Sequence, residues 1–307
     1  MATTVRWRRP FPSLAVSLVL VLLLHFLEST RASFALLQMS SSSPKAAKGL
    51  VVVTGGSRGI GAATCKLLAS RGYDVAVNYQ SGEGEARGVC DYIDAVRVEH
   101  AESSSWEYVG RAIPIKADVS IEGDVERLFD SVESQFGRPP TGLVNNAGIL
   151  GPREVDVTEL SKVALDSVMA TNVYGPFYCC REFVKRVGTK KAKEKGAKGG
   201  AIVNVSSGSA YTGRPLLYAM SKGALDSMMA GLSQTLPSEG IRINAVAPGV
   251  TETDMVTPQM IDNVIPLIPM GRAGKPEEIA EVIAFLLGDG GGGYCCGAKI
   301  RAAGGRP

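Results

Sequence analysis

Two side chains with complementary chemistry lie four positions apart in the segment YAMSK, Tyr218 and Lys222. In a helix, residues at this spacing lie one above the other on the same face. A phenol can give a proton to a carbonyl oxygen, but a pKa of about 10 makes it a reluctant donor. A lysine ammonium one turn away favours the phenolate and is expected to lower that pKa. The alternative is a surface pair that stabilises the helix by a few tenths of a kcal/mol.

A glycine-rich turn, TGGSRGIG, spans Thr54 to Gly61, directly after the apolar run LVVV and before a helical pattern. At such a helix start, backbone N–H groups and the helix dipole attract an anion such as a pyrophosphate. Gly55, Gly59 and Gly61 would let the phosphate approach and let helix and strand pack closely. The turn alone is a weak indication, but its place in the first strand–helix unit predicts dinucleotide binding.

The residues around this turn indicate which dinucleotide binds. NAD-selective folds carry an Asp or Glu after the second strand, where it bonds the ribose 2′-hydroxyl. Here that position offers Asn78, Tyr79 and Gln80, and the first acid is Glu83. Arg58 lies within the turn, where its guanidinium could bind a 2′-phosphate in fork geometry. We therefore expect NADP(H) as the cofactor; the alternative is that Arg58 is a solvated loop residue.

The composition is that of a globular protein and argues against several function classes. The chain has 307 residues, 45% of them hydrophobic and 21% charged, with a formal charge of +3 and two histidines. So small a charge, without a basic stripe, argues against nucleic acid as a partner. So little imidazole argues against a His-based metal site or a Ser/His/Asp triad, and we expect no metal. The six cysteines lack zinc or redox spacing and are expected to be small buried side chains in a reducing compartment.

Strand-like and helix-like segments alternate from residue 49 onward. Short apolar runs predict strands in LVVV, DVAVNY, AIPIKADV, GLVNNAG, AIVNVSS, IRINAVAPG and AKIRAAGG. Helix-length segments lie between most of them, for example 125–136, 159–187 and 276–287. This alternation implies parallel strands joined by right-handed crossovers. The predicted fold is an α/β, Rossmann-type doubly wound sheet of about seven strands with helices on both faces.

No linker rich in Pro or Ser divides residues 49–307, so we predict a single domain there, with loop insertions at 97–111 and 188–200. Residues 1–48 look like a targeting leader. Basic residues precede an apolar run at 14–27 that is short for a membrane span and suits a signal-peptide core. The Ser- and Lys-rich stretch that follows resembles the transit portion of a two-part plastid leader. We predict a plastid location; the alternatives are the secretory route through the ER and a membrane anchor formed by 14–27.

Four motifs stand in the order known from one family: the glycine turn, Asn145-Asn146-Ala147-Gly148 after the fourth strand, Tyr218-x-x-x-Lys222, and Pro248-Gly249 after the sixth strand. On these residues, 49–307 resembles the short-chain dehydrogenase/reductase family. The resemblance implies that Lys222 also holds the nicotinamide ribose and that Asp118 contacts the adenine. It implies cofactor contacts from Thr54, Gly55, Ser57, Arg58, Gly59, Ile60, Gly61, Asn78, Asp118, Val119, Asn145, Ala147, Gly148, Tyr218, Lys222, Pro248, Gly249 and Thr253.

The resemblance implies two further catalytic residues. A serine after the fifth strand would polarise the substrate carbonyl, and NVSSGS offers Ser206, Ser207 and Ser209, of which Ser207 fits the family pattern best. Ser207 lies 11 positions before Tyr218, fewer than is usual in the family, so the substrate wall is expected to be short. Asn172, inside a long helix, would bind a water that relays protons to the lysine. The alternative is that Asn172 ties its helix to a neighbour.

The substrate is expected to contact the variable stretches 149–157, 208–217 and 254–272. The segments NAVAPGVTETDM and IPMGRAGKPEEIAEVIAFLL resemble the 3-oxoacyl-acyl-carrier-protein reductases, so we expect an acyl-thioester ketone of fatty acid synthesis as the substrate. Sugar and other small-alcohol dehydrogenases of the family share this tail and are the first alternative. A catalytically idle dinucleotide-binding protein is the second.

Two expectations concern partners. The basic stretch 185–198 could dock an acidic acyl carrier protein, or it could be a solvated loop. Relatives usually form tetramers through two long helices, and the apolar runs in 163–184 and 224–236 suit a homotetramer. The pair Cys295–Cys296 departs from the family pattern and suggests no function.

Overall fold

Seven strands form one sheet in the order β3-β2-β1-β4-β5-β6-β7. The computed structural model describes residues 47–102, 108–153, 156–288 and 290–306. Every neighbouring pair of strands is parallel, which confirms the predicted doubly wound α/β fold. The strands are β1 (Gly49–Val53), β2 (Tyr73–Tyr79), β3 (Ala112–Lys116), β4 (Gly142–Asn145), β5 (Gly200–Val205), β6 (Ile241–Pro248) and β7 (Lys299–Ala302).

The central strand β1 is buried along its whole length. Its side chains alternate between two cores, as strand periodicity requires. Leu50 and Val52 pack into the core on one face of the sheet, and Val51 and Val53 into the core on the other. A continuous β-branched run is therefore needed here, because a parallel strand covered on both faces has no solvent side.

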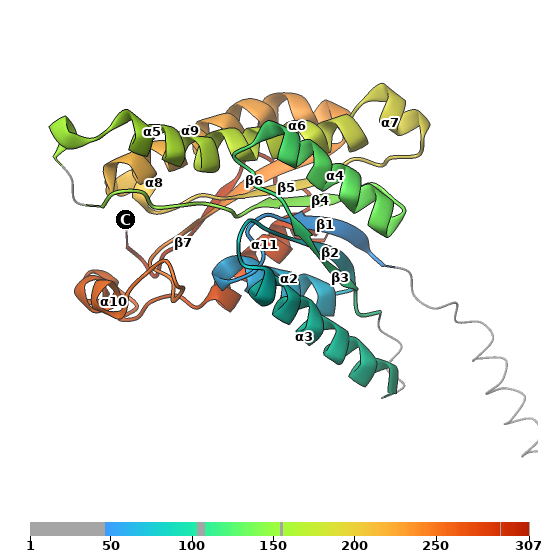
Figure 1. The fold of residues 1–307 in the computed structure, drawn as a ribbon, viewed down its shortest axis with the longest axis horizontal. Coiled ribbons are helices and arrows are strands. Elements are labelled where there is room, and N and C mark those ends of the chain that lie inside the picture. Colours follow the sequence, from blue (N-terminus) through green and yellow to red (C-terminus); the bar gives the residue numbers. More distant parts are fainter. Residues whose placement is uncertain (1–46, 103–107, 154–155, 289, 307) are drawn as a thin grey trace, which may run out of the picture. The chain divides into compact units, whose positions relative to one another are not determined.

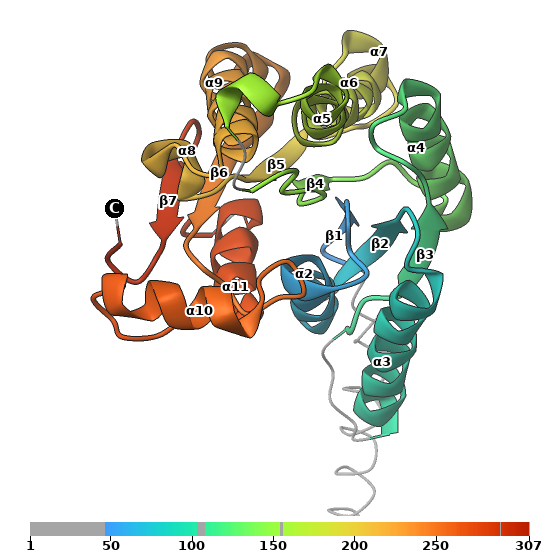
Figure 2. The same cartoon turned by 60° about the vertical axis from the view of Figure 1, so that its left-hand side comes forward.

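Helices cover both faces of the sheet, as Figures 1 and 2 show. One layer contains α2 (Gly59–Ser70), α3 (Glu83–Glu102) and α11 (Pro276–Leu287). The other contains α4 (Glu122–Phe136), α6 (Gly175–Val187) and α9 (Leu216–Thr235). The shorter elements are η1 (Val157–Glu159), α5 (Lys162–Met169), η2 (Ala170–Tyr174), α7 (Lys190–Glu194), α8 (Ser209–Thr212), η3 (Leu236–Glu239), α10 (Pro258–Val264) and η4 (Ile265–Leu267).

The strand order reverses beside β1. The chain builds β2 and β3 on one side of this strand and then continues with β4 on the other side. At such a reversal the connections leave on opposite faces of the sheet, so a crevice opens at the carboxyl ends of the strands. The motif residues of the sequence follow β1, β4, β5 and β6 at this edge.

Three predicted elements differ from the structure. The helix expected at 159–187 consists of α5, a π-helical turn and α6. The loop insertion expected at 97–111 begins inside α3, which continues to Glu102, and residues 103–107 lie outside the described part of the chain. The insertion at 188–200 contains α7, because the Thr189 side chain accepts a hydrogen bond from Ala192 N and caps this short helix.

The predicted leader lies almost wholly outside the described residues, which begin at 47. Within the described residues, no helix combines the length and the apolar character that a membrane span requires. Four cysteines (Cys65, Cys90, Cys179 and Cys180) are buried, as expected for small core side chains, and burial raises the pKa of the Cys90 thiol to about 12. The adjacent pair near the carboxyl end is partly exposed.

Candidate active site

A cleft of about 810 Å³ lies at the carboxyl ends of the strands. It collects segments that follow β1, β2, β3, β4, β5 and β6, so residues far apart in the sequence share one wall. Most of the residues predicted for the site line it: Gly55, Ser57, Arg58, Gly59, Ile60, Asn78, Asp118, Val119, Ala147, Gly148, Ser207, Tyr218, Lys222, Pro248, Gly249 and Thr253.

The backbone of the glycine turn has conformations that would be strained for residues with a side chain. Gly55 and Gly59 have φ angles of 61° and 53°, in the left-handed region that favours glycine. A Cβ at Gly61 would lie 2.2 Å from the carbonyl oxygen of Gly55, so only glycine lets α2 start this close to the turn. The first N–H groups of α2 lack helical partners and face the cleft edge. This cradle fits a dinucleotide pyrophosphate.

Arg58 lies where the second ribose of a dinucleotide would be recognised. It precedes α2, and a Cβ at Gly82, just after β2, would lie 3.3 Å from its Nη2 atom. Its only ion-pair partner among the described residues is Asp254, at 4.0 Å, and both side chains are exposed. Gln80 donates a hydrogen bond of 2.6 Å to Asp118 beside it. Residues 80–82 after β2 include no acid, and the carboxylate beside them is that of Glu85 in α3, whose Oε2 would lie 3.2 Å from the same Cβ at Gly82.

Thr54, Asn145 and Gly61 were predicted to contact the cofactor, but they do not line the cleft. The Thr54 hydroxyl donates to Val144 O and accepts from the N–H groups of Asn146 and Ala147, directly after β4, which ties the end of β1 to that of β4. The Asn145 amide donates to the side chain of Asn204 at 2.9 Å, beneath the cleft floor. Thr54, Asn145 and Gly61 therefore lie behind the residues that line the cleft and do not line it themselves.

Two amides hold the glycine turn in place. Asn78 lines the cleft, but its side chain accepts from Gly55 N and donates to Ala117 O, so it links the turn to the end of β3. Asn146, for which no role was predicted, donates to the carbonyl oxygens of Thr54 and Gly55. Its place in the Asn-Asn-Ala-Gly motif, directly after a buried strand, could have indicated this contact.

Tyr218, Lys222 and Ser207 lie together in the wall opposite the glycine turn. Tyr218 is 9% exposed and Lys222 is 3% exposed. The ammonium lies 5.5 Å from the centre of the Tyr218 ring and donates a 2.7 Å hydrogen bond to Val205 O. The Ser207 hydroxyl lies near enough to the Tyr218 phenol to lower the pKa of that phenol. A phenol, a hydroxyl and a cation thus share one buried corner of the cleft.

The protonation chemistry of this corner differs from the expectation. Burial raises the pKa of the Tyr218 phenol, and the hydrogen bond with Ser207 opposes that rise. Burial also lowers the pKa of the Lys222 ammonium to about 8, while the nearby Asp226 carboxylate opposes this change. The predicted lowering of the tyrosine pKa by the lysine is therefore not seen here, because burial raises this pKa and the group that opposes the rise is Ser207.

The three candidate serines differ in their contacts. Ser207 is the serine whose hydroxyl lowers the pKa of the Tyr218 phenol, and it accepts a hydrogen bond from Ser209 N at 3.0 Å. Ser206 is buried, and its hydroxyl has no hydrogen-bond partner among the described residues. Ser209 begins α8, the single turn of helix that forms the short substrate wall.

Charged side chains from the edge of the sheet hold this short wall. The ring of Tyr211, in α8, lies 4.2 Å from Lys299 Nζ and 4.8 Å from the Arg301 guanidinium carbon. Lys299 in turn forms a 2.8 Å ion pair with Asp226 of α9. The wall is thereby fixed to β7 by cation–π contacts, which are worth about 0.5–1 kcal/mol each at exposed sites.

Asn172 lies in the π-helical turn and is fully buried. Its amide makes two hydrogen bonds with the backbone of Ile149, of 2.8 and 2.9 Å, and a third of 3.0 Å with Ser221. It therefore ties the broken helix to the loop after β4 and to α9. A Cβ at Gly148 would meet both Asn172 Oδ1 and Lys222 Nζ, at 3.3 and 3.5 Å, so glycine keeps the space between them open.

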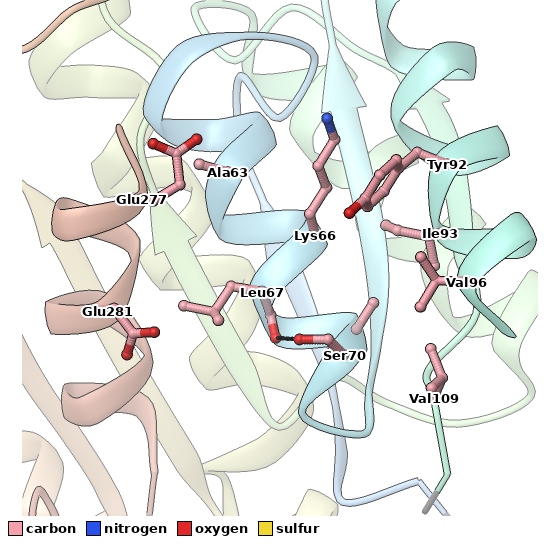
Figure 3. A pocket seen from close by; sticks show the side chains of 11 residues that line it. Ala63, Lys66, Leu67, Ser70, Tyr92, Ile93, Val96, Val109, Glu277 and Glu281 are labelled. Atoms are coloured by element: carbon pink, nitrogen blue, oxygen red, sulfur yellow. Dashed lines mark hydrogen bonds between the residues drawn. The ribbon is translucent and has the colours of Figure 1, made fainter. Parts of the chain in front are cut away.

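A second, smaller hollow of about 370 Å³ lies between α2, α3 and α11. Figure 3 shows Lys66 and Tyr92 on one side of it and Glu277 and Glu281 on the other. The Lys66 ammonium lies 4.5 Å from the centre of the Tyr92 ring. None of the residues predicted for the site lines this hollow.

Known proteins resemble this chain over most of its length. A family profile described as Enoyl-(Acyl carrier protein) reductase matches residues 55–306. The uncharacterized oxidoreductase YgfF of Escherichia coli (strain K12) is 42% identical over 264 residues, which cover 84% of this chain and 99% of that protein. A solved short chain dehydrogenase from Burkholderia cenocepacia, in complex with NADP, superposes with a TM-score of 0.71 at 32% identity, covering 83% of this chain and 96% of that one.

The chain belongs to the short-chain dehydrogenase/reductase family. As a member of this family it is an oxidoreductase that acts on alcohol and carbonyl groups. The predicted resemblance is thus confirmed.

Other members differ in their named substrates. The NADPH-dependent aldehyde reductase-like protein, chloroplastic, of Arabidopsis thaliana is 34% identical over 79% of this chain and 88% of its own length. A 3-oxoacyl-[acyl-carrier-protein] reductase of Synechocystis is 33% identical over 83% of this chain and 96% of its own length. The solved 3-ketoacyl-(acyl-carrier-protein) reductase of Brucella melitensis, complexed with NADH, has a TM-score of 0.73 at 28% identity, covering 85% of this chain and 98% of that one.

Proposed function

We propose that this short-chain dehydrogenase/reductase is an NADPH-dependent carbonyl reductase in which Tyr218 gives a proton to the substrate oxygen. The observation that supports the proposal most strongly is the buried corner of Tyr218, Ser207 and Lys222, in the same cleft as the glycine turn. A dinucleotide on that turn, with its pyrophosphate at the start of α2, would extend along the cleft towards this corner.

The chain's own residues would act on the substrate oxygen. When bound, the reduced nicotinamide supplies a hydride to the carbonyl carbon. The Ser207 hydroxyl orients and polarises the carbonyl by a hydrogen bond to its oxygen. Tyr218 donates its proton to the oxygen as negative charge develops there. The ammonium of Lys222 stabilises the phenolate that remains, since an opposite charge within a few ångströms favours the ionised form.

Arg58 supports a preference for NADP(H) over NAD(H). Its exposed guanidinium lies beside Gly82, and residues 80–82 directly after β2 include no acid, so that the carboxylate beside this glycine comes from Glu85 in α3. The Burkholderia relative was solved with NADP, although the Brucella relative was solved with NADH. We expect Arg58→Ala to weaken NADPH binding by about tenfold or more, the size of a hydrogen bond to a charged group, and to leave NADH binding nearly unchanged. Fluorescence titration with both cofactors measures the ratio, and equal losses would contradict this role.

For the substrate, we propose a 3-oxoacyl thioester, as the segments after β6 suggest, with small aldehydes or sugars as the second candidate. Named relatives of similar identity support each of them. The test is NADPH oxidation with acetoacetyl thioesters, with free and carrier-bound acyl groups, and with a panel of aldehydes and sugars. Oxidation with aldehydes or sugars but not with thioesters would reject the first candidate. Tight NADPH binding without oxidation on any carbonyl would favour the idle dinucleotide-binding protein.

The acyl carrier protein is proposed only as a partner of the basic stretch 185–198. This stretch includes α7 and precedes β5, at the end of the strands opposite the cleft. Lys185 and Lys193 already pair with Glu182 and Glu239. A carrier bound here could reach only the cleft of a neighbouring subunit, so this docking depends on the proposed homotetramer.

A plastid location remains a proposal that rests on the sequence of residues 1–48 and on the chloroplastic relative. Fusion of residues 1–48 to a fluorescent protein in an alga with complex plastids tests it. Fluorescence confined to the ER would favour the secretory alternative.

A further inference from the structure

The substrate end of the cleft is rich in arginine. Arg153 follows β4, Arg214 lies between α8 and α9, and Arg306 follows β7, and all three line the cleft. Among the described lining residues the only acids are Asp118 and Asp254. Both lie at the adenosine end, where Asp118 accepts from Gln80 and Asp254 pairs with Arg58. Within the described part of the cleft wall, no carboxylate lies at the substrate end to neutralise these arginines.

One of the three arginines has a structural partner. Arg153 donates a 2.8 Å hydrogen bond to Met255 O and contacts the sulfur of Met260, so it joins the loop after β4 to the segment after β6. Arg214 and Arg306 differ from it, because neither side chain makes an ion pair or a hydrogen bond with any described residue. Two guanidiniums in the wall of one cleft thus have all their donors available.

The backbone around these two arginines is fixed. The carbonyl oxygen of Arg306 accepts a 2.6 Å hydrogen bond from the Arg301 guanidinium, and its N–H donates to Ala303 O. Arg214 follows Gly213, whose φ of 72° ends α8, and lies four residues before Tyr218. Figure 2 shows the C-terminal end beside α8 and α10, at the β7 edge of the sheet and away from β2 and β3. Both arginines therefore belong to the catalytic side of the cleft and not to the adenosine side.

We propose that Arg214 and Arg306 bind a compact oxyanion, a carboxylate or a phosphate, carried by the substrate itself. The inference rests on the proposed reductase function and narrows the second candidate, the small carbonyl substrates, to those that carry an anionic group. Guanidinium groups bind such oxyanions through paired N–H donors. Apolar residues of the same cleft wall, such as Ile149, Met255 and Val264, would cover the carbon chain between the anion and the carbonyl. Arg306 is partly buried and Arg214 is exposed at the cleft mouth, so both guanidiniums are accessible to a substrate anion.

Matched substrates test the charge directly. The wild type is assayed with NADPH on 4-oxobutanoate against butanal, and on glyceraldehyde 3-phosphate against glyceraldehyde. We expect kcat/KM to be higher for the charged member of at least one pair, by about tenfold per arginine engaged. The first pair reports a carboxylate and the second a phosphate. Equal values, or higher values for the uncharged members in both pairs, would overturn the inference while leaving the reductase function intact.

Variants locate the effect. In Arg214→Gln and Arg306→Gln, the ratio of kcat/KM for the charged substrate to that for the uncharged one is expected to fall by about tenfold each. Because the ratio is taken within one protein, a loss common to both substrates cancels. Arg127→Gln, at an exposed position on α4 outside the cleft, is the matched control and keeps the wild-type ratio. An unchanged ratio in both cleft variants would overturn the assignment.

A binding measurement separates this inference from the reductase function. Butanoate and methyl phosphate are titrated by calorimetry into the NADPH-bound protein, with butanol as the uncharged control. We expect one of the anions to bind to the wild type and to lose affinity in the Arg214→Gln, Arg306→Gln double variant. Anion binding without turnover of any carbonyl would support the site and reject the reductase function. Turnover of carbonyls without binding of either anion would reject the anion site and support the reductase function.

Discussion

At the scale of single residues, the site joins groups whose pKa values are set mainly by burial. The spacing of Tyr218 and Lys222 was enough to predict that they meet, because residues four apart share a helix face. The direction of their pKa changes could not be predicted in this way, since it depends on how much water the surrounding elements remove. In the structure the phenol pKa is raised and the ammonium pKa is lowered.

Replacement of Tyr218 by phenylalanine removes the proposed proton donor and keeps the ring. We expect Tyr218→Phe to lower kcat by about a hundredfold to ten-thousandfold, the usual contribution of general acid catalysis. NADPH affinity should stay within a few-fold of the wild type, as measured by fluorescence titration. Tyr294→Phe, at a fully exposed position, is the matched control and should keep full activity. Turnover that survives Tyr218→Phe would remove the phenol from the mechanism.

The lowered pKa of Lys222 predicts a pH-dependent stability. Its folded-state value of about 8 lies below the ordinary 10.5, so the unfolded chain binds more protons between these pH values. The free energy of unfolding contributed by this group therefore rises with pH across that window, by roughly 3 kcal/mol in total at 1.36 kcal/mol per pKa unit. Urea unfolding of the cofactor-free protein at pH 7 and pH 10.5 measures it. Lys222→Met should lack this rise, and an identical pH dependence in the two proteins would contradict the assignment.

At the scale of elements, the strands and the glycine turn were predictable, and the interruptions of the helices were not. Buried parallel strands need continuous apolar runs, which are visible in LVVV and its counterparts. The break of the helix expected at 159–187 arises from Asn172, whose amide bonds Ile149 and Ser221 from distant segments. The roles of Thr54 and Asn145 were missed for the same reason, because their partners lie on neighbouring strands.

The close approach of α2 to the glycine turn predicts the effect of adding one methyl group. In Gly61→Ala the new Cβ would overlap Gly55 O, so the turn or the helix must move. We expect a loss of about 1–3 kcal/mol in the free energy of unfolding, typical of overpacking, together with weaker NADPH binding. Gly88→Ala, within α3 where no atom lies within 4 Å of the new Cβ, should instead gain about 0.5–1 kcal/mol. Comparable melting temperatures and NADPH affinities in the two variants would show that the turn tolerates the methyl group.

At the scale of the whole molecule, the fold class followed from the alternation of strands and helices, but assembly did not. Large apolar side chains remain exposed on the layer that contains α5, α6 and α9. They include Val163, Tyr174, Phe177, Leu216 and Met220. Exposed apolar side chains that gather into a patch mark interaction sites. The predicted homotetramer would bury it between subunits.

Charge placed on this surface tests the assembly. We expect the wild type to elute as a tetramer in size-exclusion chromatography with light scattering. Phe177→Asp should lower the mass to that of a dimer or monomer, because burying an unpaired carboxylate costs several kcal/mol per interface. Val98→Asp, at an equally exposed position on α3 in the opposite layer, should leave the mass unchanged. A monomeric wild type would reject the homotetramer.

The attachment of α8 to β7 has a consequence for assay conditions. Tyr211 is 46% exposed, and the cation–π contacts of its ring are with Lys299 and Arg301. Mobile ions screen such exposed charges over about 10 Å at 0.1 M and over about 3 Å at 1 M. Higher ionic strength should therefore weaken the contacts between α8 and β7 at a salt concentration that leaves the stability of the whole fold unchanged. KM would then climb with added sodium chloride while the melting temperature holds steady.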